Sequence, residues 1–274
     1  MRAACVIGWP IKHSRSPLIH GYWIKQHGLD AAYRSEAVEP AAFADFIRNL
    51  SSRGYVGANI TIPHKEMALE LSEPDDCARA VGAANTLWLD GGRLRSTNTD
   101  VEGFTANLDD VVPGWAGRPG EAIVLGAGGS ARAVVYGLIG RGMAKINVVN
   151  RTIDRADELR RRFGDAVQPA DWAALPGLLG RCGLLVNTTS LGMTGQPLLD
   201  IDLGPLPRHA TVTDLVYAPL KTSLLVAAAA RGLATADGLG MLLHQAVRGF
   251  ELWFGVRPRV TAELRALVET DLKK

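Results

Sequence analysis

Short apolar runs alternate with stretches of helical periodicity along the first hundred residues of the chain. Apolar runs that end at Gly or Pro predict buried strands, and apolar side chains that recur every three to four residues predict helices packed on them. The predicted strands are residues 3–7, 32–38 and 55–62, with a hairpin of residues 84–89 and 93–96. The predicted helices are residues 41–52, 65–71 and 75–81, and one that begins at Ser16-Pro17 with Ser16 as its N-cap.

A more regular alternation of strands and helices begins near residue 121. The predicted strands are residues 122–125, 146–150, 183–187 and 211–215, and the predicted helices are residues 130–141, 155–163 and 220–230. This pattern predicts a parallel sheet with right-handed crossovers. Residues 112–120 are rich in Pro and Gly and predict a hinge or linker, and residues 238–269 hold two helical patterns. The fold class is therefore α/β throughout.

The composition is typical of a globular protein. The 274 residues are 47% hydrophobic and 21% charged, and 30 basic against 28 acidic side chains give a formal charge of +2. Because this surplus is small and contains no long basic run, we expect no nucleic-acid partner. No apolar run approaches the roughly 18 residues of a membrane span, so we expect no membrane association, and residues 3–9 predict a strand rather than a secretory signal.

The cysteines and histidines give no sign of a metal site. Cys5, Cys77 and Cys182 lie far apart, and the six histidines show no paired spacing. We therefore expect no metal. Three free thiols are typical of a reducing compartment, and we expect a cytoplasmic protein.

A glycine-rich turn follows the strand predicted at residues 122–125. Gly126, Gly128 and Ala131 form the pattern G-x-G-x-x-A between a strand and a helix. In this context the first Gly permits a tight turn, the second lets the backbone approach a pyrophosphate, and the Ala allows close packing of the helix. The amino end of the helix then offers free N–H groups to the anion. The sequence therefore predicts a dinucleotide site.

The end of the next strand indicates which dinucleotide. An NAD site places Asp or Glu there to bind the ribose 2′-hydroxyl. Here the strand ends in Asn150-Arg151-Thr152, with Arg155 close behind. Guanidinium groups bind a 2′-phosphate through charge-assisted hydrogen bonds. We therefore predict NADP(H) rather than NAD, the alternative being that Arg155 is only a solvated residue of the first helical turn.

Polar clusters also stand at the ends of elements in the first hundred residues. Ser14 and Ser16 precede a helix, Lys65 follows a strand that stops at Pro63, and Asn85 and Asp100 lie beside the predicted hairpin. A lysine, an aspartate and amide groups that converge could bind one hydroxylated ligand. The alternative is that Ser16 caps a helix and that Asn85 and Asp100 form turns or caps.

These clusters belong to a longer series of segments. In chain order the segments are HSRSP, NITIPHK, GAANT, NTD, GAGGSAR, NRTIDRA, NTTSLGM, DLVYAPLKTSLL and GLGMLLHQA. Their order and spacing resemble those of the shikimate dehydrogenase family from about Val6 to Pro258. The resemblance covers nearly the whole chain.

The resemblance implies a reversible NADPH-dependent reduction of 3-dehydroshikimate to shikimate, with Lys65 as general acid/base and Asp100 beside it. Ser14, Ser16 and Tyr217 are implied to bind the substrate carboxylate, and Thr61, Asn85, Asp100 and Gln245 its hydroxyls. The implied cofactor residues are Gly126, Ala127, Gly128, Gly129 and Ser130 at the pyrophosphate, Asn150, Arg151, Thr152 and Arg155 at the adenosine phosphate, and Leu215 and Gly238 at the nicotinamide. Asp76 is a further candidate cofactor contact.

The family's fold implies two lobes. Residues 1–102 and 238–274 are expected to form the substrate-binding domain, and residues 103–237 a Rossmann-like NADP-binding domain with a parallel sheet. We expect a monomer or homodimer. Two alternatives stay open, a quinate or amino-shikimate dehydrogenase of the same superfamily and a non-catalytic NADPH-sensing module. Lys65 and Asp100 argue against a sensor, which needs no proton-transfer pair.

Overall fold

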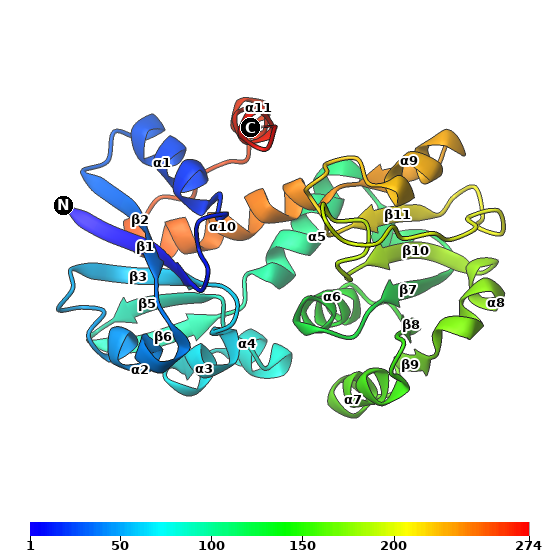
Figure 1. Ribbon diagram of the computed structural model, residues 1–274, viewed down its shortest axis with the longest axis horizontal. Coiled ribbons are helices and arrows are strands. Elements are labelled where there is room, and N and C mark those ends of the chain that lie inside the picture. The colour runs from blue at the N-terminus through cyan, green and yellow to red at the C-terminus, as the bar shows by residue number, and fades with distance from the viewer. Residues whose placement is uncertain (274) are drawn as a thin grey trace. The chain divides into compact units, whose positions relative to one another are not determined.

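The computed structural model describes residues 1–273, and the chain divides into two compact α/β units. The first unit holds Met1–Thr99 and the chain from Leu243 onward, and the second holds Asp100–Leu242. Figure 1 shows both sheets with their helices. The α/β fold class predicted from the sequence is confirmed. Within residues 1–273, no helix combines the length and apolar character needed to cross a membrane.

A six-stranded mixed sheet forms the centre of the first unit, in the order β2-β1-β3-β5-β6-β4. Its strands are β1 (Arg2–Gly8), β2 (Ala31–Ala37), β3 (Tyr55–Ile60), β4 (Glu73–Pro74), β5 (Thr86–Asp90) and β6 (Arg93–Thr97). β1 pairs in parallel with β2 and β3, whereas β5 runs antiparallel to both β3 and β6. The amino end of β5 therefore lies beside the carboxyl ends of β3 and β6.

Helices cover both faces of this sheet (Figure 1). One side carries α2 (Pro40–Arg48), α3 (Lys65–Glu70) and α4 (Asp76–Val81), and the other carries α1 (Ser16–Gln26), α11 (Ala262–Asp271) and the carboxyl part of α10 (Gly238–Phe254). α10 approaches the sheet closely, because a Cβ at Gly57 would overlap the Trp253 indole. The Trp253 Nε1 donates to the Leu87 carbonyl at 2.8 Å. Trp253 is thus a core residue.

The start of α1 differs from the prediction. The helix begins at Ser16, so Arg15 occupies the N-cap position, and no side chain caps the helix from there. The Ser14 Oγ instead accepts from the Ser16 backbone N–H at 3.3 Å. The prediction that Ser16 is the N-cap was wrong by one residue, because Pro17 lies at the second helical position rather than the first.

The second unit contains a six-stranded sheet in the order β12-β11-β10-β7-β8-β9, and every pair in it is parallel. Its strands are β7 (Glu121–Leu125), β8 (Ile146–Val149), β9 (Val167–Ala170), β10 (Cys182–Asn187), β11 (Thr211–Asp214) and β12 (Ala234–Ala236). The strand order reverses between β7 and β10. Ligands bind at the carboxyl ends of the strands at such a switch point.

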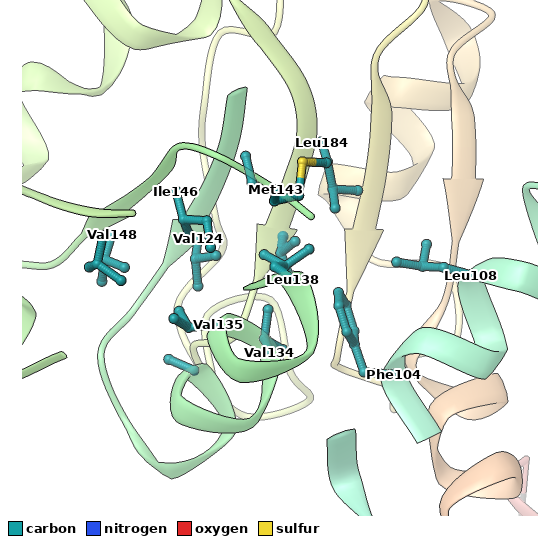
Figure 2. Packing of buried hydrophobic residues seen from close by; sticks show 14 of the residues in the cluster. Phe104, Leu108, Val124, Val134, Val135, Leu138, Met143, Ile146, Val148 and Leu184 are labelled. Atoms are coloured by element: carbon teal, nitrogen blue, oxygen red, sulfur yellow. The ribbon is translucent and has the colours of Figure 1, made fainter. Parts of the chain in front are cut away.

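Apolar layers lie on both faces of this parallel sheet. On one face α5 (Asp100–Val111), α6 (Gly129–Gly140) and α7 (Ile153–Phe163) pack on β7, β8 and β10; Figure 2 shows Phe104 and Leu108 of α5 beside Val134 and Leu138 of α6. On the other face lie α8 (Leu175–Leu179) and α9 (Ser223–Ala230). Strand residues 122 and 124 face the first layer, and residues 123 and 125 face the second. Burial on both faces explains the continuous apolar runs of the sequence.

Residues 112–120 are not a linker. Trp115 lies in the short 3₁₀ helix Trp115–Gly117 and is 2% exposed. Its Nε1 donates to the Asp109 carboxylate at 2.9 Å. The segment is therefore packed inside the second unit, where its Gly and Pro residues form turns rather than a hinge.

Candidate functional site

One edge of the first unit's sheet gathers the polar clusters of the sequence. Asn59 near the end of β3 pairs with Thr86 at the start of β5, and Thr86 pairs with Thr97 at the end of β6. The loop after β1, which carries Ser14 and leads to Ser16 at the start of α1, leaves the sheet at the same edge because β1 is parallel to β3. The strand register thus explains why clusters far apart in sequence meet.

Backbone hydrogen bonds hold these segments together. The Trp9 N–H donates to the Ile62 carbonyl at 3.1 Å, so the loop after β1 is tied to the segment that follows Thr61. The Ala84 N–H donates to the Lys65 carbonyl at 2.9 Å, which fixes the first residue of α3 beside the Asn85 segment. Lys65, Thr61 and Ser14 are all half-buried. Ammonium and hydroxyl groups therefore stand at a partly open sheet edge.

The Asn85 side chain is buried and lies at the centre of this edge. Its Oδ1 accepts from the Thr99 N–H at 2.8 Å and from the Thr99 Oγ1 at 3.2 Å. The Thr99 Oγ1 lies 3.4 Å from the Gln245 Oε1 on α10. Asn85 and Gln245, two predicted site residues separated by 160 positions, are thus joined through Thr99.

His64, next to Lys65, has a structural role. Its Nε2 lies 2.8 Å from the Val38 carbonyl, and its ring stacks on Phe43 at 4.3 Å between centroids. Burial lowers the pKa of this imidazole, and the hydrogen bond with the Val38 carbonyl opposes the shift. A buried, stacked imidazole fixes the start of α3 and with it the Lys65 backbone.

The remaining predicted residues divide between the two units. The first unit holds Ser14, Ser16, Thr61, Lys65, Asp76, Asn85 and Gln245, and the second holds Asp100, Tyr217 and the other predicted cofactor residues. Asp100 is the first residue of α5 and directly follows Thr99 in the chain. The Asp76 side chain is 99% exposed and pairs with Arg79 one helical turn on, at 3.6 Å.

The glycine-rich turn of the second unit lies at the switch point of the sheet. Gly126 has φ of +97°, and a Cβ there would lie 2.9 Å from both the Thr188 Oγ1 and the Thr189 Cγ2. Thr188 follows β10 and binds the Leu125 carbonyl through its N–H at 3.0 Å and its Oγ1 at 2.7 Å. Only Gly satisfies both the backbone conformation and the close approach.

The turn fits a dinucleotide pyrophosphate. Gly128, Gly129 and Ser130 are exposed at the amino end of the twelve-residue helix α6, and a Cβ at Gly128 would meet no atom within 4 Å. Ala131 is fully buried. An open space thus faces the free N–H groups of a helix that packs closely on its strand, which is the arrangement that binds phosphate.

The end of β8 presents cations to solvent. Arg151, Thr152 and Arg155 are exposed, and the Asn150 Nδ2 donates to the Thr152 carbonyl at 2.8 Å to shape the turn before α7. The acidic residue of the first helical turn is Asp154. Two exposed guanidinium groups, one just before α7 and one in its first turn, suit a 2′-phosphate. Among residues 1–273, no three His, Cys, Asp or Glu side chains gather as metal ligands, and the absence of a metal stays a prediction.

Comparison with known proteins gives family matches over the polar sheet edge of the first unit and over the glycine-rich turn of the second. Residues 6–87 match the shikimate dehydrogenase substrate binding domain, residues 118–193 the shikimate / quinate 5-dehydrogenase family, and residues 238–267 the shikimate 5'-dehydrogenase C-terminal domain. The chain is 66% identical over 271 residues, 99% of its length and 97% of the relative's, to a shikimate dehydrogenase (NADP(+)) of Nitrobacter winogradskyi. The chain belongs to the shikimate dehydrogenase family.

Solved structures of the shikimate dehydrogenase superfamily share the fold. Quinate dehydrogenase from Corynebacterium glutamicum, in complex with NAD, superposes with a TM-score of 0.89 at 30% identity over 98% of each chain. A shikimate 5-dehydrogenase from Thermus thermophilus, in complex with NADP(H) and shikimate, gives a TM-score of 0.81 at 33% identity over 100% of this chain and 99% of that one. The Rossmann-like parallel sheet expected from the family is confirmed.

This shikimate dehydrogenase family member holds a buried carboxylate at a strand end, where the sequence indicates only a helper or a cap. Asp214, at the end of β11, accepts from the Asn187 Nδ2 at 2.9 Å, the Val216 N–H at 3.0 Å and the Thr222 Oγ1 at 2.7 Å. Burial raises the pKa of this carboxyl, and the three donors oppose the rise. The network closes the turn that contains Leu215 and Tyr217.

Gly238 lies against the same turn. A Cβ at Gly238 would overlap the Leu215 carbonyl and would lie 2.8 Å from the Val216 carbonyl oxygen. The two residues predicted at the nicotinamide, Leu215 and Gly238, are therefore in contact. Asn187 and Asp214 hold this arrangement from the ends of β10 and β11, and their only signal in the sequence is a polar residue that ends an apolar strand.

Proposed function

We propose that this chain is an NADP-dependent shikimate dehydrogenase that interconverts shikimate and 3-dehydroshikimate. The observation that carries the proposal is the sheet edge of the first unit, where Lys65 and the buried Asn85 and Gln245 stand beside hydroxyl side chains. Such a set of donors and acceptors suits a small, polyhydroxylated acid. The dinucleotide turn at the switch point of the second unit supplies the cofactor site that a dehydrogenase also needs.

The substrate is bound through many polar groups. Its carboxylate is bound by Ser14, Ser16 and Tyr217, and its hydroxyls by Thr61, Asn85, Asp100 and Gln245. Buried site groups left unpaired by an analogue that lacks a hydroxyl make such a site selective. The connected hydrogen bonds of Asn85, Thr99 and Gln245 support this assignment, because they orient two of the groups before substrate arrives.

Lys65 acts as the general acid and base. When the hydroxyl is oxidised, the Lys65 amine takes its proton, and in the reverse direction the ammonium returns a proton to the ketone oxygen. Asp100 orients the same hydroxyl. The hydrogen bond from the Ala84 N–H to the Lys65 carbonyl holds the Lys65 backbone beside the Asn85 segment, which supports this role.

Residues of the second unit hold the cofactor. The N–H groups of residues 126–130 bind the pyrophosphate, Asn150, Arg151, Thr152 and Arg155 bind the 2′-phosphate end, and Leu215 with Gly238 contacts the nicotinamide. Asp76, which belongs to the first unit, is proposed as a further cofactor contact. The chemistry that NADP supplies when bound is hydride transfer. The cytoplasmic location and the monomeric or homodimeric state stay predictions from the sequence.

The role of Lys65 is tested by Lys65→Met, which keeps the length of the side chain but removes the proton-transfer group. General acid–base catalysis contributes roughly 10²–10⁴-fold, so kcat should fall by about that factor while the KM for shikimate changes little. Lys25→Met, at an exposed lysine of α1, is the control and should keep wild-type turnover. Wild-type kcat in Lys65→Met would remove Lys65 from the mechanism.

A further inference from the structure

A chain of hydrogen-bonded polar side chains, all buried except the half-buried Tyr33, runs through the aromatic layer between the first unit's sheet and the helices α1 and α10. It begins at Tyr33 on β2, passes through Asn59 on β3 and Thr86 on β5, and reaches Asn85 and Thr99. All five residues belong to the first unit. Asn85, which is proposed to bind the substrate, belongs to this chain of side chains. Tyr33 lies on the edge strand β2 and is far from Asn85 in the sequence.

The geometry of the sheet brings Tyr33 to Asn59 across an intervening strand. Tyr33 is in register with Ala4 of β1, and Asn59 is in register with Val6, two residues further along the same face of β1. The small Ala4 side chain lets the phenol pass over β1. The Tyr33 hydroxyl then donates to the Asn59 Oδ1 at 2.6 Å.

The Tyr33 ring is fixed by stacking. The His20 imidazole lies 4.1 Å from it between ring centroids, with an interplanar angle of 15°. The same imidazole also stacks on Phe250 of α10, at 5.9 Å between centroids. His20 is fully buried, and neither ring nitrogen makes a hydrogen bond of ordinary length, although the nearby Asn59 side chain favours the protonated imidazole. The short hydrogen bond to Asn59 in this layer comes from the Tyr33 hydroxyl.

The Tyr33 hydroxyl determines how the Asn59 carboxamide is oriented. Because the Oδ1 accepts from Tyr33, the Nδ2 points to β5, where it donates to the Thr86 Oγ1 at 3.2 Å and the Asn85 carbonyl at 3.3 Å. With its oxygen accepting from Asn59, the Thr86 hydroxyl is free to donate onward to the Asn85 Oδ1 at 3.1 Å. Each bond thus fixes the direction of the next.

We propose that Tyr33 is a positioning residue that orients the substrate-binding carboxamide of Asn85 through Asn59 and Thr86. The proposal rests on the proposed function. Without the phenolic hydroxyl, the Asn59 Oδ1 is left unpaired in a dry layer, and the carboxamide rotates to present its oxygen to Thr86. The Thr86 hydroxyl then donates to Asn59 instead of Asn85. The Asn85 Oδ1 keeps its two bonds from Thr99 but loses the third donor that holds the carboxamide in place.

Tyr33→Phe tests the proposal, because it removes the hydroxyl and keeps the stacked ring. Loss of one buried hydrogen bond corresponds to about a three- to tenfold change, so the KM for shikimate should rise by that factor. The KM for NADP should stay within about twofold of wild type, since the cofactor residues of the second unit do not depend on this chain of bonds. A purely structural role would not separate the two KM values.

Tyr55→Phe is the matched control. Tyr55 lies at the opposite end of β3 from Asn59, and its buried ring carries a hydroxyl that donates to the Glu36 carboxylate. It should lose comparable stability to thermal unfolding and keep the wild-type KM for shikimate. Equal shikimate KM values in the two variants, or a parallel rise for NADP in Tyr33→Phe, would overturn the role of Tyr33. Absence of shikimate turnover in the wild type would instead refute the proposed function and this inference with it.

Discussion

Removing the Asp214 carboxylate should unfold the turn that carries Leu215 and Tyr217. The carboxylate accepts three hydrogen bonds, from Asn187, from Val216 and from Thr222, which itself caps α9 through the Leu225 N–H at 3.4 Å. Asp214→Ala leaves these three donors without an acceptor in a site that excludes solvent. The same bonds join β10, β11 and α9, so one substitution removes the side-chain hydrogen bonds that link these three elements.

The expected loss is large for a single side chain. Each buried donor left without a partner costs about 1–3 kcal/mol, and since the three belong to one network their costs do not add fully. We therefore expect the free energy of unfolding to fall by about 3–5 kcal/mol. Asp214→Asn should cost only about 1 kcal/mol, because its oxygen still accepts from Asn187 and Val216 and its amide can donate to the Thr222 hydroxyl.

Urea unfolding and steady-state kinetics measure the two consequences. Asp171→Ala is the control, because Asp171 is an exposed carboxylate that accepts a single hydrogen bond, from the Ala174 N–H at 2.9 Å, and such a cap is worth about 1 kcal/mol. Asp214→Ala should also raise the KM for NADP and lower kcat, whereas Asp171→Ala should change neither. Equal destabilisation by the two alanine variants would refute the network argument.

Two further predictions follow from the charged and titratable groups. Replacing Arg151 and Arg155 together by Ala should raise the KM for NADP at least about tenfold and leave the KM for NAD within about twofold, because charge-assisted bonds to the 2′-phosphate are lost. Arg161→Ala, at an exposed arginine of α7, is the control. Equal effects of the double substitution on the KM values of both cofactors would contradict the assignment. Burial lowers the pKa of His20 from 6.5 to about 3, so unfolding takes up a proton below pH 6.5 and stability falls as the pH drops through that window. In His20→Phe the loss between pH 6 and 4 should be smaller by about 1.4 kcal/mol per pH unit in urea titrations. An unchanged slope in His20→Phe would show that this imidazole is already protonated in the folded state.

The elements predicted from the sequence are those whose local pattern is strong. The strand predicted at residues 122–125 is β7, and the G-x-G-x-x-A turn after it lies where the pattern placed it. Continuous apolar runs between turn residues specify such strands without reference to the rest of the chain. The hairpin of β5 and β6 was found for the same reason, since Gly91 and Gly92 mark its turn.

The elements that the sequence did not reveal depend on tertiary contacts. The helix α5 reads DVEGFTANLDDV, and only Phe104 and Leu108 mark the face that it buries. The edge strand β9 reads VQPA and lies at the end of the strand order, beside β8. Tyr33 was part of a predicted strand but was given no role, because its partner Asn59 lies two strands away in a register that one sequence does not specify.

The central claim is tested most directly by the initial rate of nicotinamide reduction with the purified wild-type protein. Shikimate and quinate would each be offered with NADP and with NAD, and the absorbance of the reduced nicotinamide would be followed. The account predicts fast reduction of NADP with shikimate and much slower rates in the other three combinations. A preference for quinate or for NAD, or no turnover of either acid despite binding of NADPH, would contradict it.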